Sequence, residues 1–404
     1  MKIPTALLIT AKIGFLVIVL GLLIGHGSQT GPIVNDTGMD EPCARFRTAN
    51  IPYVCIDEED TQGDIAQLNG VTTYNGDIIV ENTSLTSLEF LSNISAINGS
   101  LIVAENSALT TISSVAALTQ VNSLVVDNNP SLVDLVGLGG ITAVPGQVVI
   151  KNNVSLSSLA EFSIGSAASS VTISGNTSLQ DLAALANLQN VTVSLGIGGN
   201  NLNSISELSS VISVGNLGIG EPNITSLSGL SALETIDGRL TIAKCDSLTD
   251  LSGMPVLTTY SDLTIQANPM LTSLAGLPIV PADLASLSLI NNGSLVDISA
   301  LSTLNTLSGI AQIHLNPAIS SLAPLANVQS VGSLSIRSNA LLTELGLSAL
   351  QRVDNTFVIQ DNQMLCQQDA QDLLDQVLAA GGVGAIGNTT QGITISGNQQ
   401  VCNP

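Results

Sequence analysis

The sequence predicts a β-rich solenoid, a stack of about 14 short coils with one long parallel sheet and a short C-terminal capping helix. The first observation is a motif, seen in Leu263–Leu274, that recurs from about residue 70 onward. The second is its spacing, because successive copies lie 22 to 24 residues apart until a last step of 36. The third is composition: 45% of the side chains are hydrophobic but only 2% are aromatic, which suits a thin, elongated core of small aliphatic groups.

Each copy of the motif begins with a short alternating stretch, as in Leu101–Val103 and Leu334–Ile336. Alternation with a period of two is typical of a strand with one buried face. One such strand per coil predicts parallel pairing at a spacing of about 4.8 Å. Leucines three and six residues after the asparagine that follows the strand, such as Leu132 and Leu135, are expected to fill the core.

An asparagine follows the strand in nearly every copy. Its short amide can bond backbone groups left unpaired at a tight corner, and asparagine tolerates unusual backbone dihedral angles. We therefore expect the stacked asparagines to form a buried ladder. Pro222 and Cys245 take the same place in two coils, and the predicted ladder asparagines are Asn82, Asn106, Asn129, Asn153, Asn176, Asn200, Asn268, Asn292, Asn316, Asn339, Asn362 and Asn398.

Both ends of the chain depart from the repeat. Residues 1–27 combine two lysines with the apolar run Ile13–Gly25, which predicts either a cleaved signal peptide or a retained N-terminal membrane anchor. Residues 369–380 have apolar side chains at helical spacing before a Gly-Gly pair, which predicts the capping helix. The predicted organisation is this segment at 1–27, an N-terminal cap at 28–69, the repeat solenoid at 70–365 and a C-terminal cap at 366–404.

The five cysteines fit an exported protein with closed ends. Cys43 and Cys55 lie just before the first repeat, and Cys366 and Cys402 bracket the last coil. We therefore expect the disulfides Cys43–Cys55 and Cys366–Cys402, each where an open end of a solenoid needs closing. Cys245 is left over at a ladder position, where we expect a free, buried thiol with a structural role.

The net charge of −22 limits the possible partners. With 31 acidic and nine basic residues, the chain would be repelled by phosphate backbones and anionic lipid, so we expect no nucleic-acid partner. Membrane association is expected only through a possible N-terminal anchor. No motif for catalysis, for metal binding or for a cofactor is present, and Gly196–Gly199 is interpreted as strand rather than as a phosphate loop. We therefore expect no catalytic residue, no metal and no cofactor.

The outward face of the predicted sheet is uneven along its length. Strand positions four and two residues before the ladder position are apolar in the N-terminal third, glycine in the middle and polar in the C-terminal third. The candidate binding residues are a predicted column of Gln312, His314, Arg337 and Gln360. Since arginine offers a planar fork of donors, this column could hold an acidic or hydroxyl-rich group. The alternative is that these are ordinary solvated side chains.

The motif apolar-x-apolar-x-x-Asn-x-x-Leu-x-x-Leu, together with the cysteine-bounded ends, resembles leucine-rich repeat surface proteins of the receptor L-domain type. The gap of three from Asn268 to Leu271 carries the resemblance, which covers residues 70 to 402. It implies a non-enzymatic, extracytoplasmic recognition or adhesion module, secreted or at the cell surface, that binds an extracellular protein or glycan through its sheet. The alternative is a structural or surface-coat protein that self-associates without a specific ligand.

Overall fold

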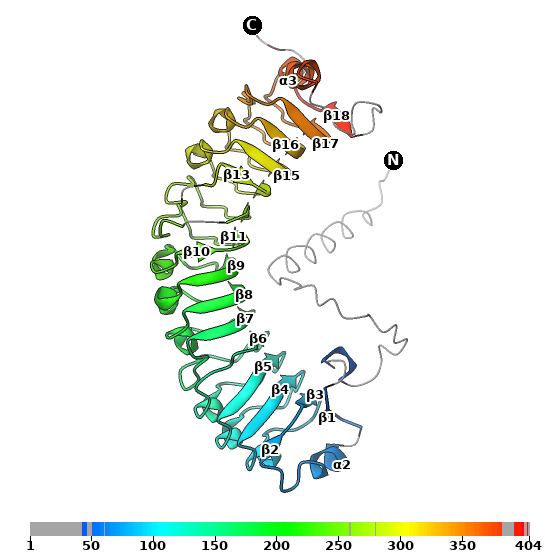
Figure 1. Ribbon diagram of the computed structural model, residues 1–404, viewed down its shortest axis with the longest axis vertical. Helices are drawn as coiled ribbons and strands as arrows, with labels where there is room; N and C mark the ends of the chain where they lie inside the picture. Colours follow the sequence, from blue (N-terminus) through cyan, green and yellow to red (C-terminus); the bar gives the residue numbers. More distant parts are fainter. Residues whose placement is uncertain are drawn as a thin grey trace, which may run out of the picture.

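The computed structural model describes residues 43–46, 51–59, 61–257, 260–278, 280–381, 392–399 and 402. The chain forms a curved stack of coils, with the strands on the concave side and short 3-10 helices on the convex side (Figure 1). The predicted signal peptide or anchor at 1–27 lies outside the described residues. Within those residues no helix is long and apolar enough to cross a membrane.

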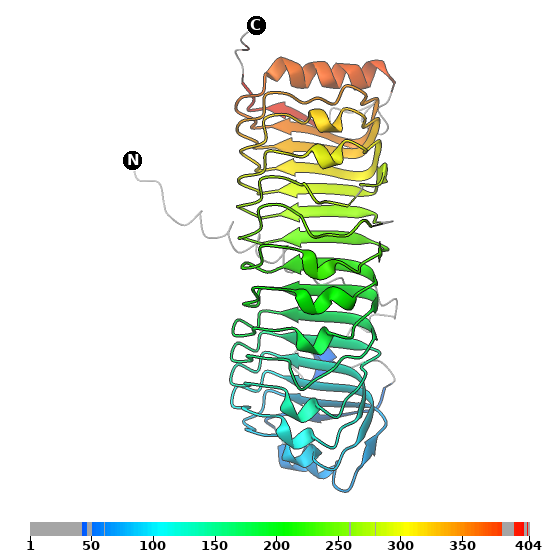
Figure 2. The same ribbon diagram turned by 90° about the vertical axis from the view of Figure 1, so that its left-hand side faces the viewer.

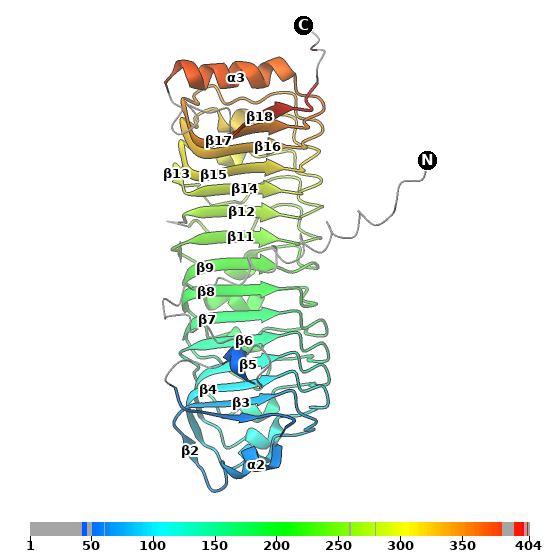
Figure 3. The same ribbon diagram turned by 90° about the vertical axis from the view of Figure 1, so that its right-hand side faces the viewer.

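A single 18-stranded sheet runs the length of the described chain, and every strand pairing in it is parallel (Figure 3). The fold is thus the β-solenoid that the repeat predicted. Its strands are β1 (Tyr53–Ile56), β2 (Thr73–Tyr74), β3 (Asp77–Glu81), β4 (Ala96–Ala104), β5 (Gln120–Asp127), β6 (Gln147–Lys151), β7 (Ala167–Ser174), β8 (Asn190–Gly198), β9 (Ser213–Gly220), β10 (Thr235–Ile236), β11 (Arg239–Ala243), β12 (Asp262–Gln266), β13 (Asp283–Leu284), β14 (Ser286–Ile290), β15 (Thr306–His314), β16 (Ser330–Arg337), β17 (Arg352–Gln360) and β18 (Ile393–Ser396).

Strand register places like residues of successive coils on top of one another. In β12, for example, Leu263 and Ile265 are buried and pair with Leu287 and Leu289 of β14. Thr264 lies between them and points outward. The inward aliphatic side chains of all coils form one continuous core, because each coil has only its neighbours to bury it.

The convex side is closed by one short turn of helix in most coils (Figure 2). In most of these turns a Ser, Thr or Asp two residues before the first residue of the turn accepts that residue's main-chain N–H, as in the 3.0 Å bond from Ala183 N to Asp181 Oδ1. This local hydrogen bond stabilises the start of the turn. The 3-10 helices of the repeats are η3 (Glu89–Leu91), η4 (Ser113–Val115), η5 (Val136–Leu138), η6 (Ala183–Leu185), η7 (Ser206–Ser210), η8 (Ser228–Leu230), η9 (Ser299–Leu301) and η10 (Ala323–Leu325).

Each end of the stack has its own cap. At the N-terminal end, η2 (Ala44–Phe46) and α2 (Thr61–Ala66) flank β1. At the C-terminal end, α3 (Gln367–Ala379) buries one apolar face on the last coil, as the helical spacing predicted. Disulfides join Cys43 to Cys55 and Cys366 to Cys402, and Cys245 is a free, buried thiol.

The buried ladder consists of asparagines that bond to the next coil and to the previous one. Asn268 donates from its main-chain N and its Nδ2 to Asn292 Oδ1, over 3.2 and 3.1 Å. Its Nδ2 also donates to the main-chain oxygen of Ile242 in the preceding coil, at 3.1 Å. The Asn268 amide therefore bonds two backbone groups of the preceding coil, Ile242 O and Cys245 N, while the amide of Asn292 in the next coil satisfies the main-chain N–H of Asn268. These bonds are why the residue is buried yet polar.

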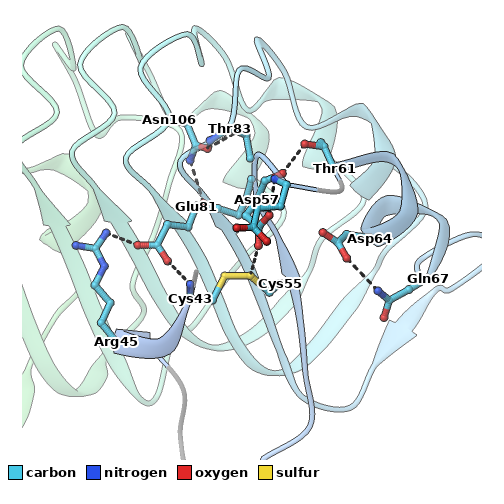
Figure 4. The surroundings of a disulfide bond; sticks show 12 residues. Cys43, Arg45, Cys55, Asp57, Thr61, Asp64, Gln67, Glu81, Thr83 and Asn106 are labelled. Carbon is cyan, nitrogen blue, oxygen red and sulfur yellow. Dashed lines mark hydrogen bonds and ion pairs between the residues drawn. A yellow bond between two sulfur atoms is a disulfide. The ribbon is translucent and has the colours of Figure 1, made fainter. Parts of the chain in front are cut away.

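The assignment of Asn82 to the ladder was wrong by one residue. Ile78 pairs with Leu101, so Thr83 is the residue that stacks on Asn106, and its main-chain N donates to Asn106 Oδ1 at 3.0 Å (Figure 4). Asn82 is exposed, with a φ of 53°. The physical reason is that the residue before each ladder position has a left-handed conformation, which asparagine also tolerates. Spacing alone could not distinguish the two places.

Candidate functional site

The concave face carries two columns of outward side chains, one on each side of the buried strand positions. Register defines both columns across the whole sheet. We call the first the inner column; it consists of Ile79, Ile102, Val125, Val149, Thr172, Gly196, Gly218, Thr241, Thr264, Ser288, Gln312, Ser335, Val358 and Thr394. The second, the outer column, consists of Glu81, Ala104, Asp127, Lys151, Ser174, Gly198, Gly220, Ala243, Gln266, Ile290, His314, Arg337, Gln360 and Ser396.

The apolar N-terminal third of this face is covered by the segment Cys43–Phe46, which we call the strap. Its residues pack in a second apolar cluster, separate from the main core, on the outward side of β3 to β6. The disulfide to Cys55 in β1 holds the strap in place, with a Cα–Cα distance of 6.2 Å. The described members of the cluster are Cys43, Phe46, Cys55, Ile79, Ile102, Ala104, Val125 and Val149.

Ion pairs and a hydrogen bond also join the strap to the sheet. Arg45 of the strap forms an ion pair with Glu81 at 2.5 Å (Figure 4). It forms a second ion pair with Glu105 at 2.7 Å, and its guanidinium lies over the Phe46 ring. The Cys43 main-chain N donates to the other Glu81 oxygen at 2.8 Å. These bonds explain how Glu81 can be 7% exposed on a concave face. This third is therefore part of the N-terminal cap and not a free surface.

The glycine middle is a flat stretch of sheet. Gly196, Gly198, Gly218 and Gly220 pair directly across β8 and β9, so both columns lack side chains there. A Cβ on Gly198 would lie 3.3 Å from the main-chain oxygen of Gly220, which is tight. The Gly196–Gly199 stretch is thus strand up to its last residue, as interpreted from the sequence, and not a loop around a phosphate.

The candidate residues lie together at the C-terminal third, but not all in one column. His314, Arg337 and Gln360 are direct neighbours on β15, β16 and β17 in the outer column. Gln312 belongs to the inner column, where it pairs with Ser335. The result is a patch two residues wide, with Arg337 exposed between a half-buried imidazole and a half-buried amide.

Two neighbours of the patch were not among the predicted binding residues. Ser335 Oγ lies 2.8 Å from His314 Nε2 and so fixes the imidazole. Leu315, directly after β15, is 44% exposed in the left-handed conformation, with a φ of 57°. A large apolar side chain is unusual there. The exception at Leu315 could have been noticed in the sequence, since most other coils have Asn, Gly or a charged residue at the position just before the ladder.

The electrostatics of the patch keep His314 neutral. Burial lowers the pKa of His314 below its ordinary value of 6.5, and the adjacent Arg337 lowers it further. No ion pair joins Arg337 to a carboxylate among the described residues. The arrangement can therefore accept a carboxylate or hydroxyl group on Arg337 without first breaking an internal ion pair.

The described residues offer little for catalysis or metal binding on this face. Among the described residues of the two columns the carboxylates are Glu81 and Asp127, and each is already paired with a basic side chain, Glu81 with Arg45 and Asp127 with Lys151 at 3.1 Å. The group of metal-binding size in this part of the chain is Cys43, Cys55 and Asp57, and both sulfur atoms of that group belong to a disulfide.

Comparisons with known proteins leave the fold assignment resting on the coils themselves. No family model matches the chain. No curated protein sequence matches it either. Among solved structures, an internalin (InlF) from Listeria monocytogenes is similar at 18% identity and a TM-score of 0.39, covering 80% of this chain and 89% of that one.

Proposed function

We propose that this protein is a non-enzymatic, extracytoplasmic recognition or adhesion module that binds a protein or glycan on the C-terminal third of its concave face. The observation that carries the proposal is the patch of Gln312, His314, Arg337 and Gln360, whose register on adjacent strands brings donors side by side. The ligand group is an acidic or hydroxyl-rich one, because the patch presents mainly N–H donors.

Two features of the chain support an extracytoplasmic location. The disulfides Cys43–Cys55 and Cys366–Cys402 close the two ends, and such bonds persist in oxidising compartments. The chain also resembles receptor L domains, in which the ligand is bound outside the cell. Secretion or cell-surface attachment through residues 1–27 is part of the same proposal.

The proposal is tested by binding of the purified, exported chain to protein and glycan arrays, followed by affinity measurements on the hits. The double substitution Arg337→Ala and His314→Ala should weaken binding by at least about 1 kcal/mol, because charge-assisted hydrogen bonds are lost. Arg352→Ala is the matched control, because Arg352 begins β17 in the same region but is paired with Asp354 at 2.6 Å. Its affinity should equal that of the unmodified chain.

The alternative function is a surface coat that self-associates without a specific ligand. Light scattering on the same samples separates the two, since a coat protein would form assemblies with itself and retain nothing on the arrays. Ligand affinity that is unchanged in the Arg337 and His314 double variant would move the binding site to another face or to the loops.

A further inference from the structure

The asparagine ladder is interrupted at two successive coils in the middle of the solenoid, at Pro222 and Cys245. In the other coils of the described chain the residue just before the ladder position has a positive φ, from 53° to 69°. Glu221 stands at that place but does not have a positive φ. The reason is Pro222, since the residue before a proline is driven toward extended conformations.

The side chain of Glu221 enters the ladder as a result. Its Oε1 accepts the Asn200 main-chain N–H at 3.2 Å and the Asn200 Nδ2 at 2.6 Å. In a regular coil the same two bonds go to an amide oxygen, as from Asn176 to Asn200 Oδ1 at 3.0 and 3.1 Å. One carboxyl oxygen of Glu221 thus replaces the amide oxygen that Pro222 cannot provide.

The next coil is matched to this interruption. Cys245 has no amide oxygen to offer the preceding coil, and Pro222 has no main-chain N–H that would need one. The Cys245 thiol still takes the donor part of the ladder, 3.8 Å from the main-chain oxygens of Ile219 and Ala243. Its main-chain N–H donates to Asn268 Oδ1 at 3.0 Å, where the regular ladder resumes.

The second oxygen of Glu221 has no acceptor role. Glu221 is 0% exposed, and its Oε2 has no hydrogen-bond partner among the described residues. The groups around the Glu221 carboxyl are neutral. They are the Asn200 amide and the Leu202 main chain in the preceding coil and the Cys245 thiol in the following coil. Asp246, beside Cys245, is exposed. A buried carboxylate without a cation is strongly disfavoured.

We propose that Glu221 is held as a neutral carboxylic acid in the folded protein at neutral pH and replaces a ladder amide, and that its ionisation makes this coil the pH-sensitive point of the solenoid. A carboxylic acid has one acceptor oxygen and one O–H donor, which reproduces the acceptor and donor of an amide. In this arrangement Oε1 is the acceptor that the ladder requires, and Oε2, which has no partner among the described residues, carries the proton.

The sign of the pH effect follows from linkage. Burial raises the pKa of Glu221 above its ordinary value of 4.5. The folded state therefore binds the proton more tightly than the unfolded chain does. The contribution of Glu221 to the free energy of unfolding is fully present below pH 4.5 and is lost as the pH rises toward the raised folded pKa. The unfolding equilibrium constant should increase by up to about tenfold for each pH unit in this window.

The experiment compares denaturant unfolding of the natural chain and Glu221→Gln between about pH 5 and 8. Glutamine keeps the amide pattern and cannot ionise, so the stability of the natural chain should fall relative to the variant as pH rises, through pH 7. Glu207→Gln, on the partly exposed Glu207 of η7, is the control and should run parallel to the natural chain. Parallel curves for Glu221→Gln would overturn the proposal.

Infrared spectroscopy provides a second test that does not depend on the variant folding. At pH 7 the natural chain should show the carbonyl stretch of a protonated carboxyl group, because exposed carboxyls are ionised there. The band should be absent from Glu221→Gln if that variant folds, and should disappear from the natural chain as Glu221 ionises at higher pH. Absence of the band at pH 7 would overturn the proposal.

Discussion

The two ends of the concave face are built from the same repeating unit, but one end is covered and the other is exposed to solvent. In the N-terminal third, Ile79, Ile102 and Val125 point outward yet are buried under the strap. In the C-terminal third, Gln312 and Ser335 hold the equivalent strand positions and are partly exposed, and the neighbouring Arg337 of the outer column is exposed. The apolar outward side chains of the N-terminal third therefore belong to a part of the sheet that the strap covers, whereas the polar patch around Arg337 is open. The difference explains why we place binding at the C-terminal third.

The largest expected effect comes from removing the bond that holds the strap. Cys43→Ser together with Cys55→Ser should lower the free energy of unfolding by about 2 to 3 kcal/mol, since the bond closes a short loop. It should also uncover the apolar outward side chains of β3 to β6. Chemical denaturation measures the first effect, and binding of a hydrophobic dye to the native state measures the second.

The disulfide at the other end is the matched control for that comparison. Cys366→Ser with Cys402→Ser should cost a similar free energy, but no strap over the concave face depends on it. Dye binding should therefore rise in the first pair of substitutions and not in the second. Equal dye binding in both would mean that the strap stays in place without its disulfide.

The asparagine ladder should contribute equally to stability in both thirds, so ladder substitutions are the second test of the comparison. Asn339→Ala removes an amide that accepts two bonds from Asn316 and donates to Ile313, and should cost about 1 to 3 kcal/mol. Asn129→Ala in the N-terminal third should cost as much, because its bonds are equivalent. Asn201→Ala, at an exposed asparagine, should cost little. Denaturation midpoints that coincide for all three variants would contradict a buried ladder.

Repetition explains what the sequence could predict and what it could not. Each coil repeats the same inward residues, so the sheet, the core and most of the ladder follow from one motif. The strap has no period, and its contact with Ile79 and Val125 joins segments far apart in the chain, so nothing local indicates it. The ladder role of Glu221 was not predicted for a similar reason. The motif places this residue at an exposed corner, and only the following proline turns its side chain inward.

A smaller effect is expected from the charged contact of the strap. Arg45→Ala removes the ion pairs to Glu81 and Glu105, and Arg45 is 46% exposed in its side chain, so solvent weakens both pairs. We expect a loss of about 0.5 to 1 kcal/mol, well below that of the disulfide. The loss should shrink at high salt. A salt-independent loss of the same size as the disulfide's would mean that Arg45 acts through packing instead.

The smallest effect concerns the open third and its single histidine. The pKa of His314 is lowered by burial and by Arg337, so the folded state disfavours the imidazolium. Its contribution to stability is present above the ordinary pKa of 6.5 and is lost as the pH falls below that value through the folded pKa. The natural chain should therefore lose stability relative to His314→Asn on acidification. Arg337→Gln should reduce that loss, because the repulsive charge is removed while Ser335 still holds the ring. Denaturation of the three chains over about pH 5 to 8 checks both statements. If Arg337→Gln leaves the acid loss unchanged, the two side chains do not interact, and the patch would be two separate residues rather than one site.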